Sequence, residues 1–211
     1  MTLKVHEIFY SIQGESSFAG YPCVFIRLAG CNIRCSYCDA QEAITDINAK
    51  EFDVDDIILM VKRLGEKVSL VEITGGEPML QAGIYELFNE LLRLKFNVLL
   101  ETNGTVDLKD VPKSIVKIMD IKCPSSGFAH CNNYKNLDYI NENDEIKLVI
   151  ADETDYSFAK DFIGNNTLKT KKIIFSPVEN RFSAKELAYN ILKDHLNVRV
   201  GIQLHKVLNL K

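Results

Sequence analysis

Three cysteines lie within a stretch of eight residues, at Cys31, Cys35 and Cys38, and no fourth cysteine is close to them. A structural zinc site needs four ligands, commonly two CxxC pairs, and the other cysteines do not have that spacing. Three thiolates suit an iron–sulfur cluster in which the protein binds three irons and the fourth is open to a further ligand. The spacing therefore predicts a [4Fe–4S] cluster, with a zinc-binding module or buried structural thiols as the alternatives.

A second motif, TGGEP from Thr74 to Pro78, follows a short apolar run. Its two glycines would let the backbone approach a ligand closely, and the carboxylate of Glu77 would accept a hydrogen bond from an ammonium group. By itself a glycine pair before proline indicates only a turn. Its position one apolar run after the cysteines gives it more weight.

Both motifs follow short apolar runs that we predict to be strands, and most of these runs are nearly continuous, as in buried parallel strands. The runs cover residues 23–30, 69–74, 97–102, 115–122, 145–150, 172–176 and 198–204, and helical patterns cover 54–64, 82–94 and 183–195. Alternating strands and helices predict an α/β fold with a parallel sheet curled toward a barrel. A complete eightfold barrel takes about 250 residues. We therefore predict a partial, open parallel β/α barrel that forms a single domain over residues 1–211.

In such barrels the chemistry gathers at the carboxyl ends of the strands. The cysteine loop follows the first predicted strand, TGGEP the second, TNGT the third and CPSSG the fourth. We expect these four loops to form one site. The polar stretch 125–144 is predicted to be an insertion or a mobile loop.

Composition limits the classes of function. With 46% hydrophobic residues in 211, the chain can bury a substantial core. A formal net charge of -4 argues against nucleic-acid binding and favours a small-molecule substrate. The sequence shows no apolar run long enough for a bilayer and no signal-peptide pattern, so we expect a cytoplasmic protein with reduced cysteines and no membrane partner.

The CxxxCxxC spacing resembles the signature of the radical S-adenosylmethionine (SAM) superfamily, and TGGEP resembles that superfamily's GGEP motif. The resemblance implies that the open iron binds SAM, and that reductive cleavage of SAM gives a 5′-deoxyadenosyl radical that abstracts a hydrogen atom. Beside the three cysteine ligands, it implies cofactor contacts from Tyr37, Asp39, Gly76, Glu77, Asn103, Ser125 and Ser176.

Residues 7–39 and the sequence GIQLHK at 201–206 are similar to the 7-carboxy-7-deazaguanine synthase (QueE) family, and this resemblance runs from one end of the chain to the other. That family converts 6-carboxy-5,6,7,8-tetrahydropterin into 7-carboxy-7-deazaguanine and releases ammonia, on the route to queuosine or archaeosine. A glycyl-radical enzyme activase is the alternative within radical SAM enzymes, but it leaves SIQGES, Arg27 and QLHK unexplained.

The family resemblance also implies a substrate site. The turn Ile12, Gln13, Gly14 and Glu15 would bind the pterin edge, and Thr74 would contact the substrate near the second strand. Glu15 and His205 are the catalytic candidates, and the terminal carboxylate of Lys211 is a further candidate for substrate binding.

Arg27 is a lone cation inside an apolar run. From its residue type alone it either pairs with an internal carboxylate, Glu72 or Glu101, or faces the rim and binds a substrate carboxylate through its guanidinium fork. The family resemblance implies the second role.

One residue departs from the family pattern. The family usually has CDT after the cysteines, and its threonine ligates a magnesium ion, whereas this chain has CDA with Ala40. Because water readily fills a Mg²⁺ coordination position, we predict that magnesium dependence is weakened or met differently. The resemblance further implies an electron donor such as flavodoxin or ferredoxin, and a homodimer.

Overall fold

The computed structural model describes all residues from 1 to 211 and contains one nine-stranded sheet in the order β3-β1-β2-β4-β5-β6-β7-β8-β9. Its strands are β1 (Thr2–Ile12), β2 (Pro22–Leu28), β3 (Lys50–Asp53), β4 (Leu70–Gly75), β5 (Asn97–Thr102), β6 (Val116–Ile121), β7 (Glu145–Ile150), β8 (Lys172–Pro177) and β9 (Arg199–Val200). From β2 to β9 all neighbours are parallel, whereas β1 runs antiparallel to both β2 and β3. The sheet stays open, because β3 and β9 are its two edges. The predicted open α/β barrel is confirmed.

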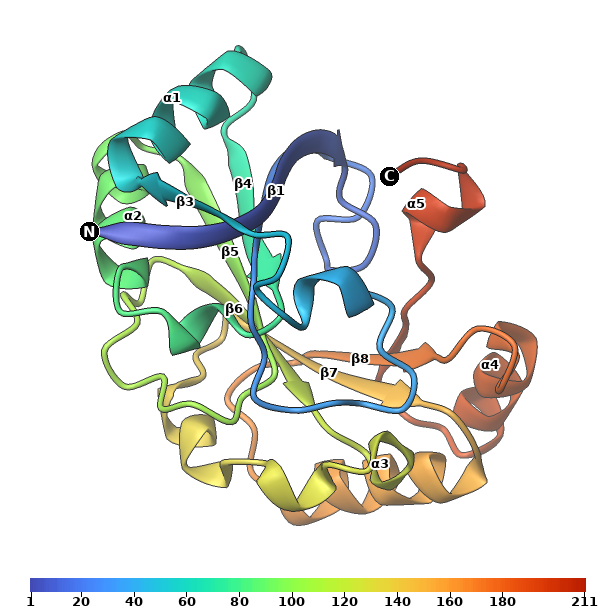
Figure 1. Ribbon diagram of the computed structural model, residues 1–211. Helices are drawn as coiled ribbons and strands as arrows, with labels where there is room; N and C mark the ends of the chain where they lie inside the picture. The colour runs from blue at the N-terminus through green and yellow to red at the C-terminus, as the bar shows by residue number, and fades with distance from the viewer.

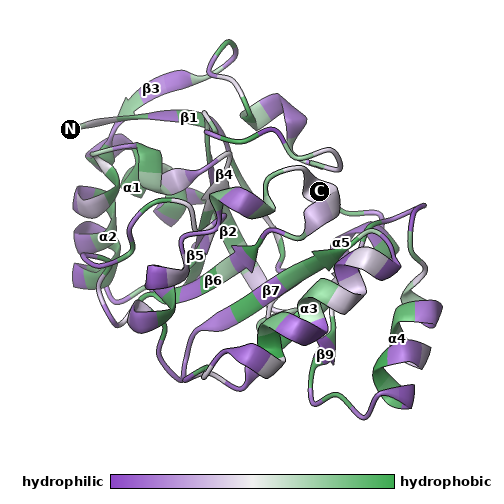
Figure 2. Cartoon of the chain, turned by 90° about the horizontal axis from the view of Figure 1, so that it is seen from below, coloured by the Kyte–Doolittle hydropathy of each residue, from purple (hydrophilic) through white to green (hydrophobic).

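Five α-helices accompany the sheet: α1 (Val54–Leu64), α2 (Ile84–Arg93), α3 (Glu153–Asn165), α4 (Ala184–Lys193) and α5 (Leu204–Val207). Helices α1 to α4 each precede a parallel strand and lie on the outer face of the curved sheet (Figure 1). Figure 2 shows apolar residues on the sides of α1 and α2 that face the strands and polar residues on their outer sides. None of the helices is long and apolar enough to cross a bilayer.

The two faces of the sheet differ in composition. On the outer face, residues such as Val71 and Ile73 of β4 join the main hydrophobic core under the helices. On the inner face, a small cluster of apolar side chains closes the amino-terminal end of the barrel: Cys23, Phe25, Leu70, Leu99 and Ile118. Because side chains alternate along a strand, the residues two positions further along the same strands face the same interior. Those residues are polar or charged: Arg27, Glu72, Glu101 and Asp120.

Several elements differ from the sequence-based prediction. Strands β1 and β3 and helices α3 and α5 were not predicted, and the run at 198–204 forms only the two-residue strand β9 before the chain turns into α5. Helix α3 has a polar composition, and it starts where the Asp152 side chain accepts a hydrogen bond from the backbone N–H of Asp155. After β9, Gly201 packs so closely that an added Cβ would lie 2.2 Å from Oγ of Ser176. This contact brings the C-terminal segment back over the open end of the barrel.

The polar stretch 125–144, predicted to be an insertion or a mobile loop, packs against the barrel. It contains three short 3-10 helices, at Pro124–Ser126, Ala129–Cys131 and Tyr134–Tyr139. Asn136 is fully buried and donates hydrogen bonds to the carbonyl oxygens of Gly104 and Val106. The stretch therefore fastens the loop after β5, which takes part in the site.

Candidate active site

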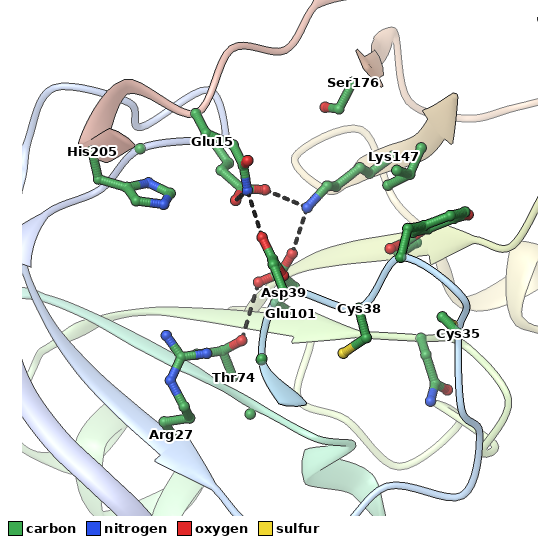
Figure 3. A pocket seen from close by; sticks show the side chains of 18 of the residues that line it. Glu15, Arg27, Cys35, Cys38, Asp39, Thr74, Glu101, Lys147, Ser176 and His205 are labelled. Carbon is green, nitrogen blue, oxygen red and sulfur yellow. Dashed lines mark hydrogen bonds and ion pairs between the residues drawn. The ribbon is translucent and has the colours of Figure 1, made fainter. Parts of the chain in front are cut away.

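A cavity of about 550 Å³ opens at the carboxyl ends of the parallel strands, inside the curve of the sheet (Figure 3). Its volume is within the range of roughly 300–1,000 Å³ typical of small-molecule sites. The cysteine loop, the TGGEP loop and the loops after β5 and β6 all contribute to its wall. Of the four loops predicted to form one site, the first three line the cavity, whereas after β6 only Lys122 does and the CPSSG residues do not.

The cysteine loop connects β2 to β3. Cys31, Cys35 and Cys38 are half-buried, form no disulfide, and line the cavity. The amide of Asn103 donates a hydrogen bond to Sγ of Cys31 at 3.7 Å, which ties the loop after β5 to the first cysteine. Burial raises the pKa values of Cys35 and Cys38, so these thiols need a metal to displace their protons before they can be charged ligands.

The cysteine arrangement fits the expected cluster. No group of three or more histidine, cysteine, aspartate or glutamate side chains is drawn together around the position of a single ion. A single zinc ion needs its ligands at about 2.0–2.3 Å from one point, whereas a four-iron cluster binds each thiolate to a different iron and keeps the sulfurs apart. Three free thiols on one cavity-lining loop therefore suit the cluster better than a closed zinc site.

The TGGEP loop is joined by its backbone to the start of the cysteine loop. Gly76 N–H donates to the Leu28 carbonyl at 3.0 Å, and Glu77 N–H donates to the Gly30 carbonyl at 2.8 Å. A Cβ on Gly75, whose φ is +140°, would lie 2.0 Å from the Leu28 oxygen. The glycines are thus required for the two loops to lie side by side, and Gly76 lines the cavity next to the cysteines.

Glu77 and Ser125, two of the residues predicted to contact the cofactor, do not line the cavity. The fully buried Glu77 carboxylate accepts hydrogen bonds from Thr102 Oγ1 at 2.8 Å and from Asn103 N–H at 2.7 Å. The Ser125 hydroxyl donates to Asp152 at the start of α3, at 2.6 Å. Both residues hold the walls of the site in place. The other residues predicted for the cofactor do line the cavity: Tyr37, Asp39, Gly76, Asn103 and Ser176.

The residues predicted to bind substrate all line the same cavity: Ile12, Gln13, Gly14, Glu15, Arg27, Thr74, His205 and Lys211. The two sequence motifs SIQGES and QLHK are in direct contact, because Leu204 N–H donates to the Gly14 carbonyl at 2.9 Å. A Cβ on Gly14 would lie 2.1 Å from Nδ1 of His205, so only glycine permits this packing. The start and the end of the chain thus build one wall together.

Arg27 does not pair with either internal carboxylate that the sequence suggested. Its Nε donates to Glu7 of β1 at 3.0 Å, and its guanidinium lies 5.7 Å from the centre of the Phe9 ring. Glu7 could not be foreseen as the partner because β1 was not predicted as the neighbour of β2. The ion pair uses only Nε and leaves Nη1 and Nη2 without a hydrogen bond, and Arg27 lines the cavity.

A group of charged side chains lies at the centre of the cavity (Figure 3). The ammonium of Lys147 on β7 contacts the carboxylates of Glu15 and Glu101, the second at 2.8 Å. Thr74 Oγ1 donates to the other oxygen of Glu101 at 3.1 Å, and the Gln203 amide donates to Glu15 at 2.7 Å and to Asp39 at 2.8 Å. Lys147 and Gln203 were not among the predicted site residues. For Lys147, the available signal was a charged residue inside an apolar run.

Glu72 and Glu101, two carboxylates of the cavity, have different protonation states. Burial, together with the nearby charge of Glu101, raises the pKa of Glu72 to about 8, so Glu72 is mostly protonated at neutral pH. Burial also acts to raise the pKa of Glu101, but the adjacent ammonium of Lys147 outweighs it and lowers that pKa. The amide of Gln13 donates to Glu72. The site thus presents one neutral acid beside an ionised, lysine-paired one.

Comparisons with known proteins agree with this geometry. The family model described as Radical SAM superfamily matches residues 25–123, which run from within β2 through the cysteine loop to the end of β6. The open barrel and the three free cysteines beside a cavity are therefore those of a radical SAM enzyme. The chain is similar in fold to the crystal structure of QueE from Escherichia coli, with a TM-score of 0.81 at 24% identity over 97% of this chain and 95% of that chain.

Sequence relatives define the family more narrowly. The chain is 40% identical to the 7-carboxy-7-deazaguanine synthase of Koribacter versatilis, over 98% of this chain and 96% of the relative. It is 43% identical to the 7-carboxy-7-deazaguanine synthase of Chlorobaculum tepidum, over 98% of this chain and 94% of the relative. The chain belongs to the 7-carboxy-7-deazaguanine synthase family. This assignment replaces the two alternative classes, a glycyl-radical enzyme activase and a zinc-binding module.

Proposed function

We propose that this protein is a carbon–nitrogen lyase that converts 6-carboxy-5,6,7,8-tetrahydropterin into 7-carboxy-7-deazaguanine with release of ammonia, in 7-deazapurine biosynthesis. The observation that carries the proposal is a single cavity that is shared by the cysteine loop and by the wall built from SIQGES, Arg27 and QLHK. The names of the relatives that match nearly the whole chain support the same reaction.

The cofactors of a radical SAM enzyme are a [4Fe–4S] cluster and SAM. In this chain Cys31, Cys35 and Cys38 would hold the cluster, and the two cofactors together supply the one-electron chemistry when bound. The cavity-lining residues next to this loop would bind and orient SAM: Tyr37, Asp39, Gly76, Asn103 and Ser176. Glu77 and Ser125 would act indirectly, by fixing the loops that carry these contacts.

The substrate would lie against the central charged group. The free guanidinium nitrogens of Arg27 suit its carboxylate, since a planar fork binds a carboxylate at two points. The pterin edge carries N–H donors, which suit the carboxylates of Glu15 and Glu101. The Gln13 amide oxygen already accepts the backbone N–H groups of Glu15 and Ser16, so Gln13 would fix the turn that carries Glu15 and would offer the pterin edge its remaining amide hydrogen. Thr74 and the carboxylate at Lys211 would complete this part of the wall, and His205, which packs against Gly14, would hold or move a proton at the substrate.

Three finer features belong to the same proposal. Ala40 lines the cavity but offers no oxygen ligand, so a magnesium ion there would be held by substrate and water rather than by this side chain. The electron donor would be a small redox protein such as flavodoxin or ferredoxin. The chain would act as a single domain within a homodimer.

The proposal is tested by incubating the anaerobically purified, reduced protein with SAM and 6-carboxy-5,6,7,8-tetrahydropterin. Mass spectrometry should detect 7-carboxy-7-deazaguanine, and an ammonia assay should give an equal amount of ammonia. A protein that contains the cluster and cleaves SAM but leaves the pterin unchanged would refute the substrate assignment.

A further inference from the structure

Lys147 joins two carboxylates that come from distant parts of the chain. It lies in the middle of β7 with its side chain on the inner face of the barrel, and the residue is only 8% exposed. Its ammonium contacts Glu15, in the turn after β1, and Glu101, near the end of β5. Figure 3 shows the ammonium between the two carboxylates at the centre of the cavity.

Fold stability alone does not account for this arrangement. Moving charges from water into a protein costs several kcal/mol per ion, and replacing a buried ion pair by apolar residues is often neutral or stabilising. The inner face of the parallel strands has other charged residues: Arg27, Glu72, Glu101 and Asp120. They also line the cavity and do not belong to the apolar cluster below it. The position of Lys147 therefore points to a ligand in the cavity.

The two carboxylates are each fixed from two sides. Glu101 is held by Lys147 at one oxygen and by the Thr74 hydroxyl at the other. Glu15 is held by Lys147 at one oxygen and by the Gln203 amide at the other, at 2.7 Å. Because each carboxylate oxygen has two lone-pair sites, these contacts orient the oxygens without using all their capacity to accept hydrogen bonds. They are preorganised acceptors for donors on a ligand.

The charge of Lys147 sets the protonation of its surroundings. The acidic groups near it are Glu15, Asp39, Glu72, Glu101 and Asp120, and Lys122, which pairs with Asp120 at 2.7 Å, is a second cation nearby. Although burial opposes its charge, the neighbouring carboxylates hold the pKa of Lys147 well above its ordinary value. Lys147 thus stays a cation over the neutral range and neither gives nor takes a proton there.

We infer that Lys147 is a positioning residue for the substrate: its ammonium holds the carboxylates of Glu15 and Glu101 in place as paired acceptors for the N–H donors of the pterin edge. The inference rests on the proposed function, because the donors belong to the pterin. Without this cation, the desolvation that acts to raise the pKa of Glu101 would no longer be outweighed, so the carboxylate would be protonated over a wider pH range and lose one of its acceptor sites.

The test is equilibrium binding rather than turnover. Calorimetry measures the Kd of 6-carboxy-5,6,7,8-tetrahydropterin for anaerobic, cluster-containing protein from about pH 6 to about pH 9, the range in which a buried carboxylate can titrate. The variants are Lys147→Met, Lys147→Gln and Lys147→Arg. Lys172→Met on the neighbouring strand β8 is the matched control, because the Lys172 ammonium binds only the Asn143 carbonyl, at 2.9 Å and away from the cavity.

We expect Lys147→Met and Lys147→Gln to weaken binding by about 10- to 100-fold, the equivalent of one hydrogen bond to a charged group. The loss should be largest at low pH, where Glu101 is protonated, and should shrink as the pH rises. Lys147→Arg should recover most of the affinity, and Lys172→Met should bind as the wild type does. If Lys147→Met does not fold, the same pH dependence is required of Lys147→Gln.

Two results would overturn the inference. The first is wild-type affinity at every pH in a folded variant without the cation. The second is an equal loss in Lys147→Arg and Lys147→Gln, which would mean that shape rather than charge matters. If the wild-type protein does not bind the pterin at all, the proposed function itself is refuted. This outcome differs from both results above, in which the wild type binds.

Discussion

Replacing Arg27 by glutamine tests how the site recognises the substrate carboxylate. The guanidinium has two unpaired nitrogens at the cavity, whereas its Nε is bound to Glu7. Glutamine keeps one neutral donor and loses the charged fork. The expected loss is on the order of one hydrogen bond between charged groups, about 1.5–3 kcal/mol, which corresponds to an increase in Kd of about 10- to 150-fold.

The fold should tolerate this change. The side chains of Arg27 and Glu7 are 26% and 22% exposed, and Glu7 has a second ion-pair partner in Lys211. The free energy of unfolding should therefore fall by about 1 kcal/mol or less. Iron content and SAM binding should be unchanged, since no hydrogen bond joins Arg27 to the cysteine loop.

The assay is calorimetric binding of the carboxytetrahydropterin to anaerobic protein, with Arg93→Gln as the matched control. Arg93 also forms an ion pair with a glutamate, Glu90 at 2.7 Å, but on the outer helix α2 and far from the cavity. Its substitution should leave Kd unchanged. Wild-type affinity in a folded, iron-containing Arg27→Gln protein would refute the carboxylate-binding role.

Three further predictions follow from single residues. Cys35→Ala should remove the cluster, so the anaerobic protein should lose its iron, sulfide and brown colour; full iron content would show that Cys35 is not a ligand. Ala40→Thr supplies an oxygen ligand at the cavity, so turnover of this variant should depend more strongly on added Mg²⁺ than turnover of the wild type. An identical and tight magnesium requirement in both proteins would contradict the weakened dependence. Glu72 binds a proton in the folded state at pH values where the unfolded chain has lost it, so its contribution to the free energy of unfolding should fall as the pH rises from about 4.5 to about 8. Glu72→Gln should remove part of this decline in denaturant titrations of the metal-free protein, and an unchanged pH profile would count against a protonated Glu72.

The barrel could be predicted from sequence because its strands and helices have clear local patterns. The bounds of β5 and β7 agree with the predicted runs at 97–102 and 145–150, and the four rim loops meet as the topology requires. Strand β1 was missed because its polar end was interpreted as the start of a turn. Helix α3 was missed because its buried face includes a charged residue, Asp155, and a small one, Ala159, beside Tyr156 and Phe162, so its apolar stripe is weak.

The ionic pairing inside the cavity depends on contacts that no local pattern contains. Lys147 meets Glu15 and Glu101 only after the sheet has curled, and Arg27 meets Glu7 only because β1 pairs antiparallel with β2. One signal was present in the sequence. The apolar runs carry isolated charged residues at alternate positions, including Glu72, which period-two counting places on the inner face. These strands were predicted to be almost continuously apolar. In the structure their outer face is apolar, and their inner face is polar toward the carboxyl ends of the strands.

The central claim is that Cys31, Cys35 and Cys38 leave one iron open within the cavity that also binds the pterin. Electron paramagnetic resonance of the reduced, anaerobic protein, recorded before and after SAM and then after the carboxytetrahydropterin, tests this claim most directly. A [4Fe–4S] signal that SAM changes, and that the pterin changes again, is the predicted result. A cluster signal that neither compound alters, or a protein that holds zinc instead of iron, would contradict the account.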